Sequence, residues 1–240
     1  VSFNGGTKDN AIPRECEASL IYESDEEAAK AEELACELAE TYAEELTPAE
    51  PDFSCEISCE TNRTAEAIPQ DAAKEFICAM RLAPNGIQKR NIKMDGFVVV
   101  SLNLGVVRTE EDRIVMIFSP RSSVASLQED TKERLNTLAE TFGFTVSHSS
   151  EYPGWSFKED SPVREICKES YKELFGEDLK IEAIHAGLEC GLFSDAIKGL
   201  DAIAIGPTIA NCHTPDEYLT LDSFERFYEF LKDILSRLAK

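Results

Sequence analysis

The chain has 240 residues, 42% of them hydrophobic and 8% aromatic, which suffices for one large or two small folded domains and excludes a disordered tail. Its formal net charge of -22 argues against nucleic acid as a partner, because binding to phosphates requires clustered Lys and Arg. No apolar run approaches the ~20 residues that cross a bilayer, and the first residues lack the basic and apolar parts of a secretory signal. We therefore expect an acidic cytoplasmic protein with no membrane partner. Because residue 1 is not Met, we also expect it to lie inside a longer gene product.

Eight cysteines are spread along the chain without a Cys-x-x-Cys pair, which argues against a structural zinc site built from thiolates. Cys36 and Cys78 fall on apolar helical faces, while Cys55 and Cys59 alternate with polar residues as the inward positions of a strand would. We therefore expect buried, reduced thiols in a reducing compartment.

The first part of the chain alternates strand and helix patterns. Residues 14–22 alternate polar and apolar like a half-buried strand, and a capping box at Ser24 opens a helix that runs to about Leu46. Residues 53–59 predict a second strand, and Pro69 introduces a second helix. This order is a strand-helix-strand-helix unit.

A similar order follows. Residues 96–107 and 113–119 predict adjacent strands, residues 124–142 predict a helix closed by Gly143, and residues 144–148 predict a further strand. The two halves therefore look like variants of one α+β unit.

The pattern changes after about residue 151. Residues 161–176 predict a helix with Pro at its first position and Gly just past its end. Residues 179–185 and 201–206 are short apolar segments of the kind buried in a parallel sheet, and an amphipathic helix that includes Phe227 closes the chain. We interpret this region as the last portion of a larger α/β domain.

Three residues of this last region are candidates for chemistry. His213 follows the Gly-Pro turn after the second apolar segment, where it could bind zinc or be an ordinary surface histidine. Glu189 sits among apolar residues, where a carboxylate would either cap backbone amides or orient a ligand. The position of His185 at the end of a predicted strand indicates a packed or hydrogen-bonded histidine rather than a metal ligand.

Further candidates lie earlier. Arg121 follows an extended strand, and its guanidinium could hold a substrate carboxylate or make a surface ion pair. Asn10 and Asn103 could donate amide hydrogens to a peptide carbonyl, although both also suit turns and strand ends. A thiol hydrolase that pairs Cys190 or Cys212 with a histidine is a weaker alternative, because no electropositive helix N-terminus activates either thiol.

Several motifs occur in one order along the chain. They read NGGTKDNAIPRE at residues 4–15, SLNLGVV at 101–107, YPGW at 152–155, SPV at 161–163, IHAGLECGLF at 184–193, and IGPT followed by HTPDE through residue 217. From about Phe3 to its last residue, the chain resembles the cytosolic aminoacyl-histidine dipeptidases, also called Xaa-His or nonspecific cytosol dipeptidases. The IHAGLECGLF and HTPDE motifs carry most of this resemblance.

The resemblance implies a hydrolase with a pair of zinc ions that polarise the scissile carbonyl of a dipeptide and activate a bridging water, with a glutamate as general base. It implies a lid domain at about residues 1–150, built of two similar α+β units with an antiparallel sheet and helices on one face. Residues 151–240 would be the C-terminal part of an α/β zinc-peptidase catalytic domain.

The same resemblance implies roles for individual residues. His213 matches the last metal ligand of the family. The implied substrate contacts are Arg121 for the carboxylate, Asn10 and Asn103 as polar contacts, and Glu189 with Gly191 at the wall of the cleft.

The other metal ligands of the family and its general-base Glu belong to an N-terminal segment, and this chain has no H-x-D or E-E-x-G motif in a suitable strand. We therefore expect the parent protein to be a metallo-dipeptidase and this chain to be inactive alone. A second hypothesis is a noncatalytic binding or dimerisation module, whose exposed edge strands pair across a two-fold axis to form a homodimer.

Overall fold

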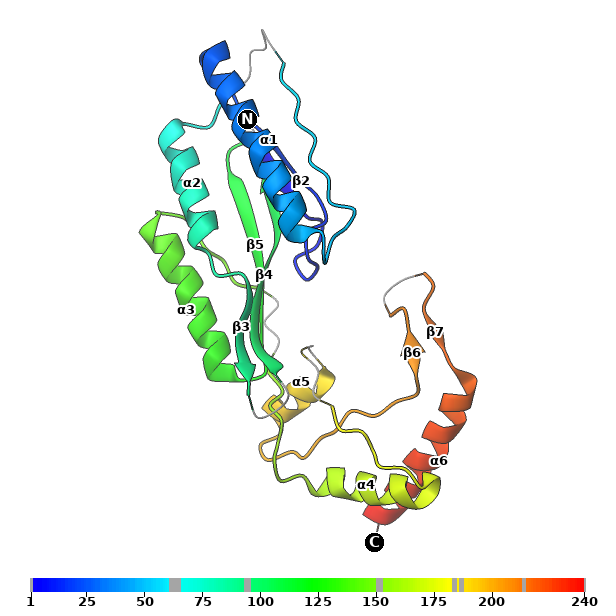
Figure 1. The fold of residues 1–240 in the computed structure, drawn as a ribbon. Helices are drawn as coiled ribbons and strands as arrows, with labels where there is room; N and C mark the ends of the chain where they lie inside the picture. Colours follow the sequence, from blue (N-terminus) through cyan, green and yellow to red (C-terminus); the bar gives the residue numbers. More distant parts are fainter. Residues whose placement is uncertain are drawn as a thin grey trace. The chain divides into compact units, whose positions relative to one another are not determined.

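The computed structural model describes residues 2–60, 66–92, 96–149, 153–182, 185, 188–212 and 215–239 (Figure 1). The chain divides into two compact units, the first made of Val1–Ala83 and Asn103–Ser119 and the second of Pro84–Leu102 and Pro120–Lys240. The domain boundary predicted near residue 150 lies inside the second unit and stays a prediction. Within the described ranges, no helix has the length and apolar character needed to cross a membrane.

Five strands form one sheet. They are β1 (Ser2–Gly5), β2 (Cys16–Ser19), β3 (Gly86–Asn91), β4 (Phe97–Thr109) and β5 (Ile114–Ser122). The order is β2-β1-β4-β3, with β5 also paired to β4, and the β1–β2, β1–β4 and β3–β4 pairs are antiparallel. The chain is therefore a mixed α/β protein built on an antiparallel sheet. The predicted strands at 96–107 and 113–119 are confirmed. The strand predicted at 14–22 is present but shorter, at Cys16–Ser19, and its residues are exposed, so the prediction that it is half-buried is wrong. The short β1 and the polar β3 were not predicted.

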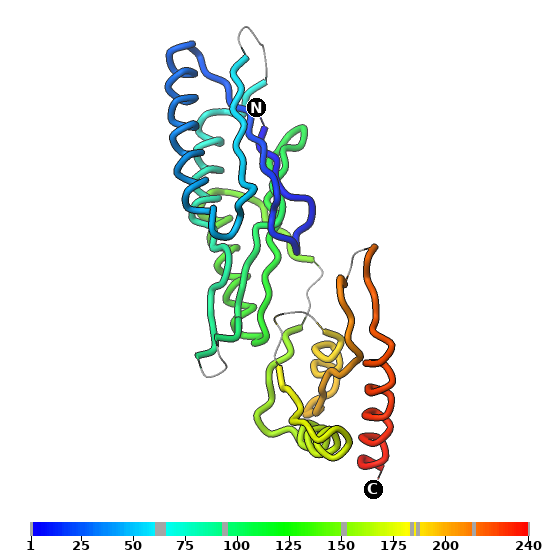
Figure 2. The backbone as a smooth tube through the Cα atoms, turned by 45° about the vertical axis from the view of Figure 1, so that its right-hand side comes forward, coloured from blue at the N-terminus to red at the C-terminus, as the bar shows by residue number. Residues whose placement is uncertain are grey.

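Two helices belong to the first unit, α1 (Asp25–Leu46) and α2 (Gln70–Leu82), and they lie side by side in Figures 1 and 2. The predicted cap of α1 is confirmed, because the Ser24 side chain accepts a hydrogen bond from the Glu27 N–H at 3.2 Å. Helix α2 packs against β1, where the rings of Phe3 and Phe76 meet edge to face at 5.5 Å.

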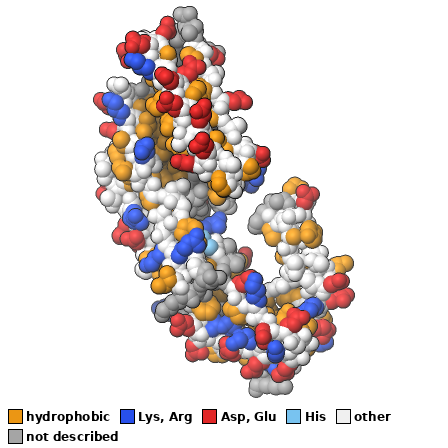
Figure 3. All heavy atoms as spheres, viewed as in Figure 1, with side chains coloured by type: hydrophobic (Ala, Val, Ile, Leu, Met, Phe, Trp, Pro, Cys, Tyr) orange, Lys and Arg blue, Asp and Glu red, His pale blue; other side chains and the backbone are white. Residues whose placement is uncertain are grey.

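Helix α1 has the solvated acidic face expected of an amphipathic helix, but its large apolar residues are not packed against the rest of the unit. Its carboxylates are solvated, as predicted, and Figure 3 shows acidic side chains gathered over this helix. The apolar residues Leu34, Leu38 and Tyr42 are 55%, 43% and 49% exposed, while alanines occupy the half-buried positions. The close-packed stripe of α1 is therefore formed by its small residues.

The strand predicted at 53–59 is wrong. These residues have no ladder partner, and Phe53 and Ile57 are 38% and 36% exposed. Alternation alone does not make a strand, because the backbone N–H and C=O groups need a neighbouring strand. The prediction of buried thiols is also wrong, both for Cys55 and Cys59 in this segment and for most of the other cysteines. All eight cysteines are free thiols, and only Cys167 is buried.

The second unit contains α3 (Ala125–Thr141), α4 (Pro162–Phe175), α5 (Glu189–Ala196) and α6 (Leu221–Leu238). Helix α3 ends as predicted at Gly143, whose φ of +67° suits a residue without a side chain. The strand predicted at 144–148 is wrong, because the Phe144 N–H donates back to the Ala139 carbonyl at 2.8 Å and its ring stacks on Phe142.

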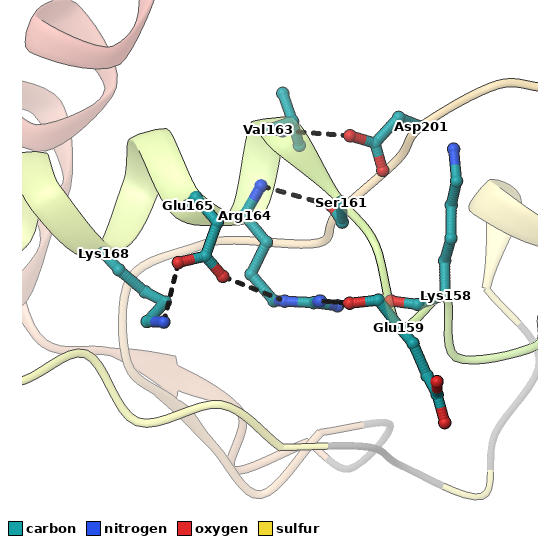
Figure 4. A network of polar contacts seen from close by, with 8 residues as sticks. All are labelled: Lys158, Glu159, Ser161, Val163, Arg164, Glu165, Lys168 and Asp201. Carbon is teal, nitrogen blue, oxygen red and sulfur yellow. Dashed lines mark hydrogen bonds and ion pairs between the residues drawn. The ribbon is translucent and has the colours of Figure 1, made fainter.

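Helix α4 begins at a network of polar contacts (Figure 4). The Ser161 side chain accepts from the Arg164 N–H at 3.2 Å, and Oδ2 of Asp201 accepts from the Val163 N–H at 2.9 Å. Pro162 has no N–H to satisfy, so the first turn of α4 leaves no free donor. Asp201, which follows α5 in the sequence, thus holds the start of α4 in place.

Helices α4 and α6 form the core of this part of the chain. Cys167 is fully buried against Phe230 and Ile234, and the rings of Tyr171 and Phe175 pack around Phe230 with centroids 5.3 and 6.5 Å away. This packing confirms the amphipathic helix predicted at the end of the sequence.

The parallel strands predicted at 179–185 and 201–206 are wrong for every described residue of these segments. The structure instead has two short antiparallel strands of two residues each, β6 (Ile209–Ala210) and β7 (Tyr218–Leu219). Apolar runs of this kind become parallel strands only when another strand pairs with them, and no described strand pairs with either segment.

Candidate substrate site

The candidate residues fall in both units. Asn10 and Asn103 belong to the first unit, whereas Arg121, Glu189 and Gly191 belong to the second. His213 lies outside the described residues. The structure therefore describes the surroundings of five of the six predicted site residues.

His185 is hydrogen-bonded to β4. Its Nε2 lies 2.6 Å from the Ser101 hydroxyl, and its ring also donates to the backbone carbonyl of Val98. Burial lowers the pKa of His185, the positive charge of Arg121 lowers it further, and the bond to Val98 only partly opposes these effects. The prediction of a hydrogen-bonded histidine is confirmed, and Arg121 is its charged neighbour.

Arg121 is half-buried near the end of β5. Among the described residues no carboxylate forms an ion pair with it, although the chain has 46 Asp and Glu residues. The alternative of an ordinary surface ion pair is therefore not observed in that part of the chain. A half-buried guanidinium with free donors is suited to an incoming carboxylate.

The Pro-Gly-Trp segment joins the residues after Arg121 to α5. A Cβ on Gly154 would lie 2.6 Å from the Ser122 carbonyl oxygen, and a Cβ on Gly191 would lie 2.6 Å from that of Pro153. These approaches require glycine at both positions, because real Cβ atoms do not come so near to backbone oxygens. Gly191 is buried at this junction, so its backbone is held in place by packing.

Glu189 is the first residue of α5, and it is exposed. Its apolar neighbours in the sequence therefore do not bury it. The N-cap residue of α5 is Leu188, which makes no side-chain cap hydrogen bond, and among the described residues no bond from the Glu189 carboxylate to a backbone amide is observed. An exposed carboxylate at a helix N-terminus is stabilised by the helix dipole and stays available to a cationic ligand.

Asn10 lies in the loop between β1 and β2, where it is exposed. Asn103 points at that loop from β4, and its Nδ2 donates to the carbonyl oxygens of Asp9 and Ala11, each at 2.8 Å. The two asparagines predicted as polar contacts are therefore neighbours in the structure.

The described residues do not assemble a metal site. No group of three or more His, Cys, Asp and Glu side chains that could hold a metal ion is found among them. The thiol-hydrolase alternative also finds no support there, because the Sγ of Cys190 faces the Ile203 carbonyl at 3.9 Å and no histidine.

Sequence reasoning missed Ser101 as the partner of His185 and Gly154 as a close contact. The alternation of Ser101, Asn103 and Gly105 among the apolar residues of β4 was the available signal, since every second residue of a strand lies on the same face.

The antiparallel sheet with its helices defines a mixed α/β chain, and the sequence adds an ordered series of motifs. It belongs to the peptidase family M20/M25/M40, whose family model matches residues 7–237. The chain is 32% identical to the cytosol non-specific dipeptidase of Escherichia coli (strain K12), over 99% of this chain and 49% of that protein.

Two solved structures share the fold. The aminoacylhistidine dipeptidase from Vibrio alginolyticus matches with a TM-score of 0.82 and 32% identity, over 99% of this chain and 48% of that one. The aminopeptidase PepT from Bacillus cereus shares the fold at a TM-score of 0.54 and 19% identity, over 70% of this chain and 45% of that one. The chain thus spans about half the length of the relatives it matches.

Proposed function

We propose that the chain forms part of a cytoplasmic zinc-dependent dipeptidase that hydrolyses Xaa-His and other dipeptides through a metal-activated water. The observation that carries this proposal is that Arg121 is half-buried and has no carboxylate partner among the described residues. This is notable because the chain has a net charge of -22 and therefore many carboxylates. A dipeptide brings the missing carboxylate at its C-terminal end. The names of the two relatives at 32% identity support the same substrate class.

In this proposal Arg121 holds the substrate carboxylate through a bidentate pair of hydrogen bonds. The exposed Glu189 at the start of α5 faces solvent and offers a negative charge to the substrate amine, while Gly191 is packed against the Pro153 carbonyl and fixes the backbone beside it. Asn10 contacts the peptide group from its exposed loop. Each of these groups orients the dipeptide and none of them performs the bond cleavage.

For the metal, we propose one ligand from this chain and no complete site. A zinc ion would supply the Lewis acid and the activated water. The described residues do not fit a complete site, so we assign His213 as one expected ligand and derive no step through the metal. Because the relatives are about twice as long, we propose that the other ligands and the general base lie in the part of the fold that this chain does not span.

Binding of a Xaa-His dipeptide to the chain tests the role of Arg121. We expect the dipeptide to bind more tightly than its C-terminal amide, and Arg121→Met to remove this preference while Arg121→Lys keeps part of it. Arg113→Met is the matched control, because Arg113 is paired with Glu110 in the β4–β5 turn. Equal binding of the dipeptide and its amide to the unmodified chain would contradict the assignment.

Hydrolysis by the purified chain tests the division of the site. We expect no cleavage of a Xaa-His dipeptide above a metal-free control when the chain is incubated with zinc, because the described residues assemble no metal site. Cleavage that depends on zinc would show that a site forms within these 240 residues.

A noncatalytic dimerisation module is the second candidate, and exposed surface of the first unit favours it. Strand β2 lies at an edge of the sheet with all four residues exposed. A homodimer that dissociates when Ala18→Lys places a charge on this edge, and that binds no dipeptide, would support the module. A monomer at micromolar concentration that binds the dipeptide would support the enzyme.

A further inference from the structure

We propose that Asn103 is a positioning residue that holds the Asn10 loop, defined as residues 6–15 between β1 and β2, in one conformation. Its side chain acts on the chain's own backbone and does not contact the substrate. This inference rests on the proposed function in one respect, namely that Asn10 is the residue of this loop that meets the dipeptide.

The hydrogen bonds of Asn103 account for both of its donors. A side-chain amide has two N–H groups, and Nδ2 donates one to the carbonyl of Asp9 and one to that of Ala11, at 2.8 Å each. These carbonyls lie directly before and directly after Asn10. The amide of Asn103 therefore fixes the backbone on both sides of the proposed substrate contact and has no N–H left for a ligand.

The strand register explains why an asparagine is needed at this place. Strands β1 and β4 are paired at Gly5 and Val107. Four residues further along the loop and four residues back along β4, Asp9 lies opposite Asn103. The ladder has ended there, because residues 6–15 belong to no strand. The side chain of Asn103 supplies the hydrogen bonds that the backbone no longer makes.

Two glycines bring the loop close enough for these bonds. A Cβ on Gly105 would lie 2.3 Å from the Asp9 carbonyl oxygen. Gly6 has a φ of +69°, and a Cβ there would lie 1.9 Å from the Gly105 carbonyl oxygen. Larger residues at either position would lift the loop from β4, so Gly6, Gly105 and Asn103 serve the same contact.

The loop has little else to order it. Residues 7–15 are exposed, and two backbone hydrogen bonds within the loop are long: Ala11 N–H to the Lys8 carbonyl at 3.3 Å and Gly6 N–H to the Glu15 carbonyl at 3.2 Å. An exposed loop that must become ordered when a ligand binds loses affinity to conformational entropy. By ordering the loop beforehand, Asn103 would remove that cost.

Amide hydrogen exchange of the Asn10 loop in the full 240-residue chain tests the proposal. Asn103→Ala removes both donors, and Asn103→Asp also sets a carboxylate against two carbonyl oxygens. We expect exchange of the two hydrogen-bonded amides of the loop, those of Gly6 and Ala11, to rise about tenfold in the first variant, as for two exposed hydrogen bonds lost, and further in the second.

Gln88→Glu is the matched control. Gln88 also donates its side-chain amide to two backbone carbonyls, those of Asn85 and Gly86 at 2.9 and 3.3 Å, but at the start of β3. We expect the Gln88→Glu variant to leave amide exchange in the Asn10 loop unchanged. Unchanged exchange in both Asn103 variants, or an equal rise throughout the chain, would overturn the positioning role.

Titration with a Xaa-His dipeptide separates this proposal from the proposed function. We expect the side-chain NH₂ resonance of Asn10 to shift on binding, and the dipeptide to bind about tenfold more weakly to Asn103→Asp than to Gln88→Glu, since an unordered loop costs affinity. If exchange in the loop is faster in the Asn103 variants but Asn10 does not respond to the dipeptide, Asn103 remains the residue that positions the loop and Asn10 is removed from the substrate site. A direct shift of the Asn103 side-chain amide by the dipeptide, with loop exchange unchanged, would overturn the inference.

Discussion

Nε2 of His185 lies 2.6 Å from the hydroxyl of Ser101, which joins β4 to the segment that leads into α5. The two residues are 84 positions apart, and Arg121 lies close enough for its charge to act on the imidazole. The hydrogen bond thereby connects β4 to His185, and the charge of Arg121 acts on the same imidazole.

Removing either member of this pair should destabilise the second unit. For Ser101→Ala we expect the free energy of unfolding to fall by about 1 kcal/mol, because a part-buried ring nitrogen loses its partner. His185→Gln should cost a similar amount, and the double variant should cost less than the sum of the two. Urea unfolding of all four proteins measures this coupling, and strict additivity would mean that the contact contributes nothing.

The lowered pKa of His185 predicts the direction of a pH effect. Burial and the charge of Arg121 hold this pKa below the value in the unfolded chain, so the unfolded chain takes up the proton first as the pH falls. The stability contributed by the neutral ring is present above about pH 6.5 and is lost progressively below it. Thermal unfolding between pH 7.5 and 5.5 should therefore show a smaller decline for His185→Gln than for the unmodified chain.

His148→Gln is the control for that measurement. Its Nε2 lies 2.9 Å from Asn136 on the exposed surface after α3. This variant should keep the full pH-dependent decline, and a flattened decline in His148→Gln would assign the effect to the wrong histidine.

The elements that could be predicted from the sequence are those specified by neighbouring residues. Ser24 opens α1 and Ser161 with Pro162 opens α4, because caps act within one helical turn. Gly176 closes α4 with a φ of +72°, again a local requirement. The segments 53–59 and 201–206 have the apolar pattern of strands, yet a strand also needs a partner that the segment itself does not specify.

The candidate site could be predicted only in part for the same reason. The motifs identified the residues, but their partners are far apart in sequence: Ser101 for His185, and the Asp9 and Ala11 carbonyls for Asn103. The apolar letters around Glu189 predicted burial, whereas the start of a short helix exposes that side chain.

Asp201 should stabilise the start of α4 in a pH-dependent way. Burial raises its pKa, but hydrogen bonds from the Val163 N–H and the Ser161 hydroxyl and the charges of Lys158 and Arg164 outweigh this, so the pKa is lowered. We expect Asp201→Ala to lower the free energy of unfolding by about 1 kcal/mol at pH 7, as for loss of a helix cap.

The sign of the pH dependence follows from the lowered pKa. The contribution of Asp201 is present above its unfolded pKa, near 4, and is lost as the pH falls through the folded value. Urea midpoints measured from pH 7 to pH 3 should therefore converge for Asp201→Ala and the unmodified chain. A difference that stays constant over this range would mean that the charge of Asp201 has no part in the cap.

The core between α4 and α6 should depend on Phe230 far more than on other aromatic residues of α6. Phe230 is 5% exposed and packs on Tyr171 and Phe175, whereas Phe224 on the same helix is 48% exposed. We expect Phe230→Ala to cost about 3–5 kcal/mol, through lost burial and the cavity left behind. Phe224→Ala should cost much less, and equal losses in denaturant unfolding would argue against this core.

Close packing at Gly191 should make this position intolerant of even one methyl group. A Cβ there would lie 2.6 Å from the Pro153 carbonyl oxygen, which is backbone and cannot rotate away. Gly191→Ala should therefore displace the start of α5 and lower the free energy of unfolding by about 1–3 kcal/mol, the usual cost of overpacking. Gly206→Ala is the matched control, since a Cβ at Gly206 meets nothing within 4 Å, and it should change stability by no more than about 0.5 kcal/mol. Because α5 begins with Glu189, the proposed dipeptide binding should weaken in Gly191→Ala and stay unchanged in Gly206→Ala; unchanged binding in both would separate α5 from the substrate site.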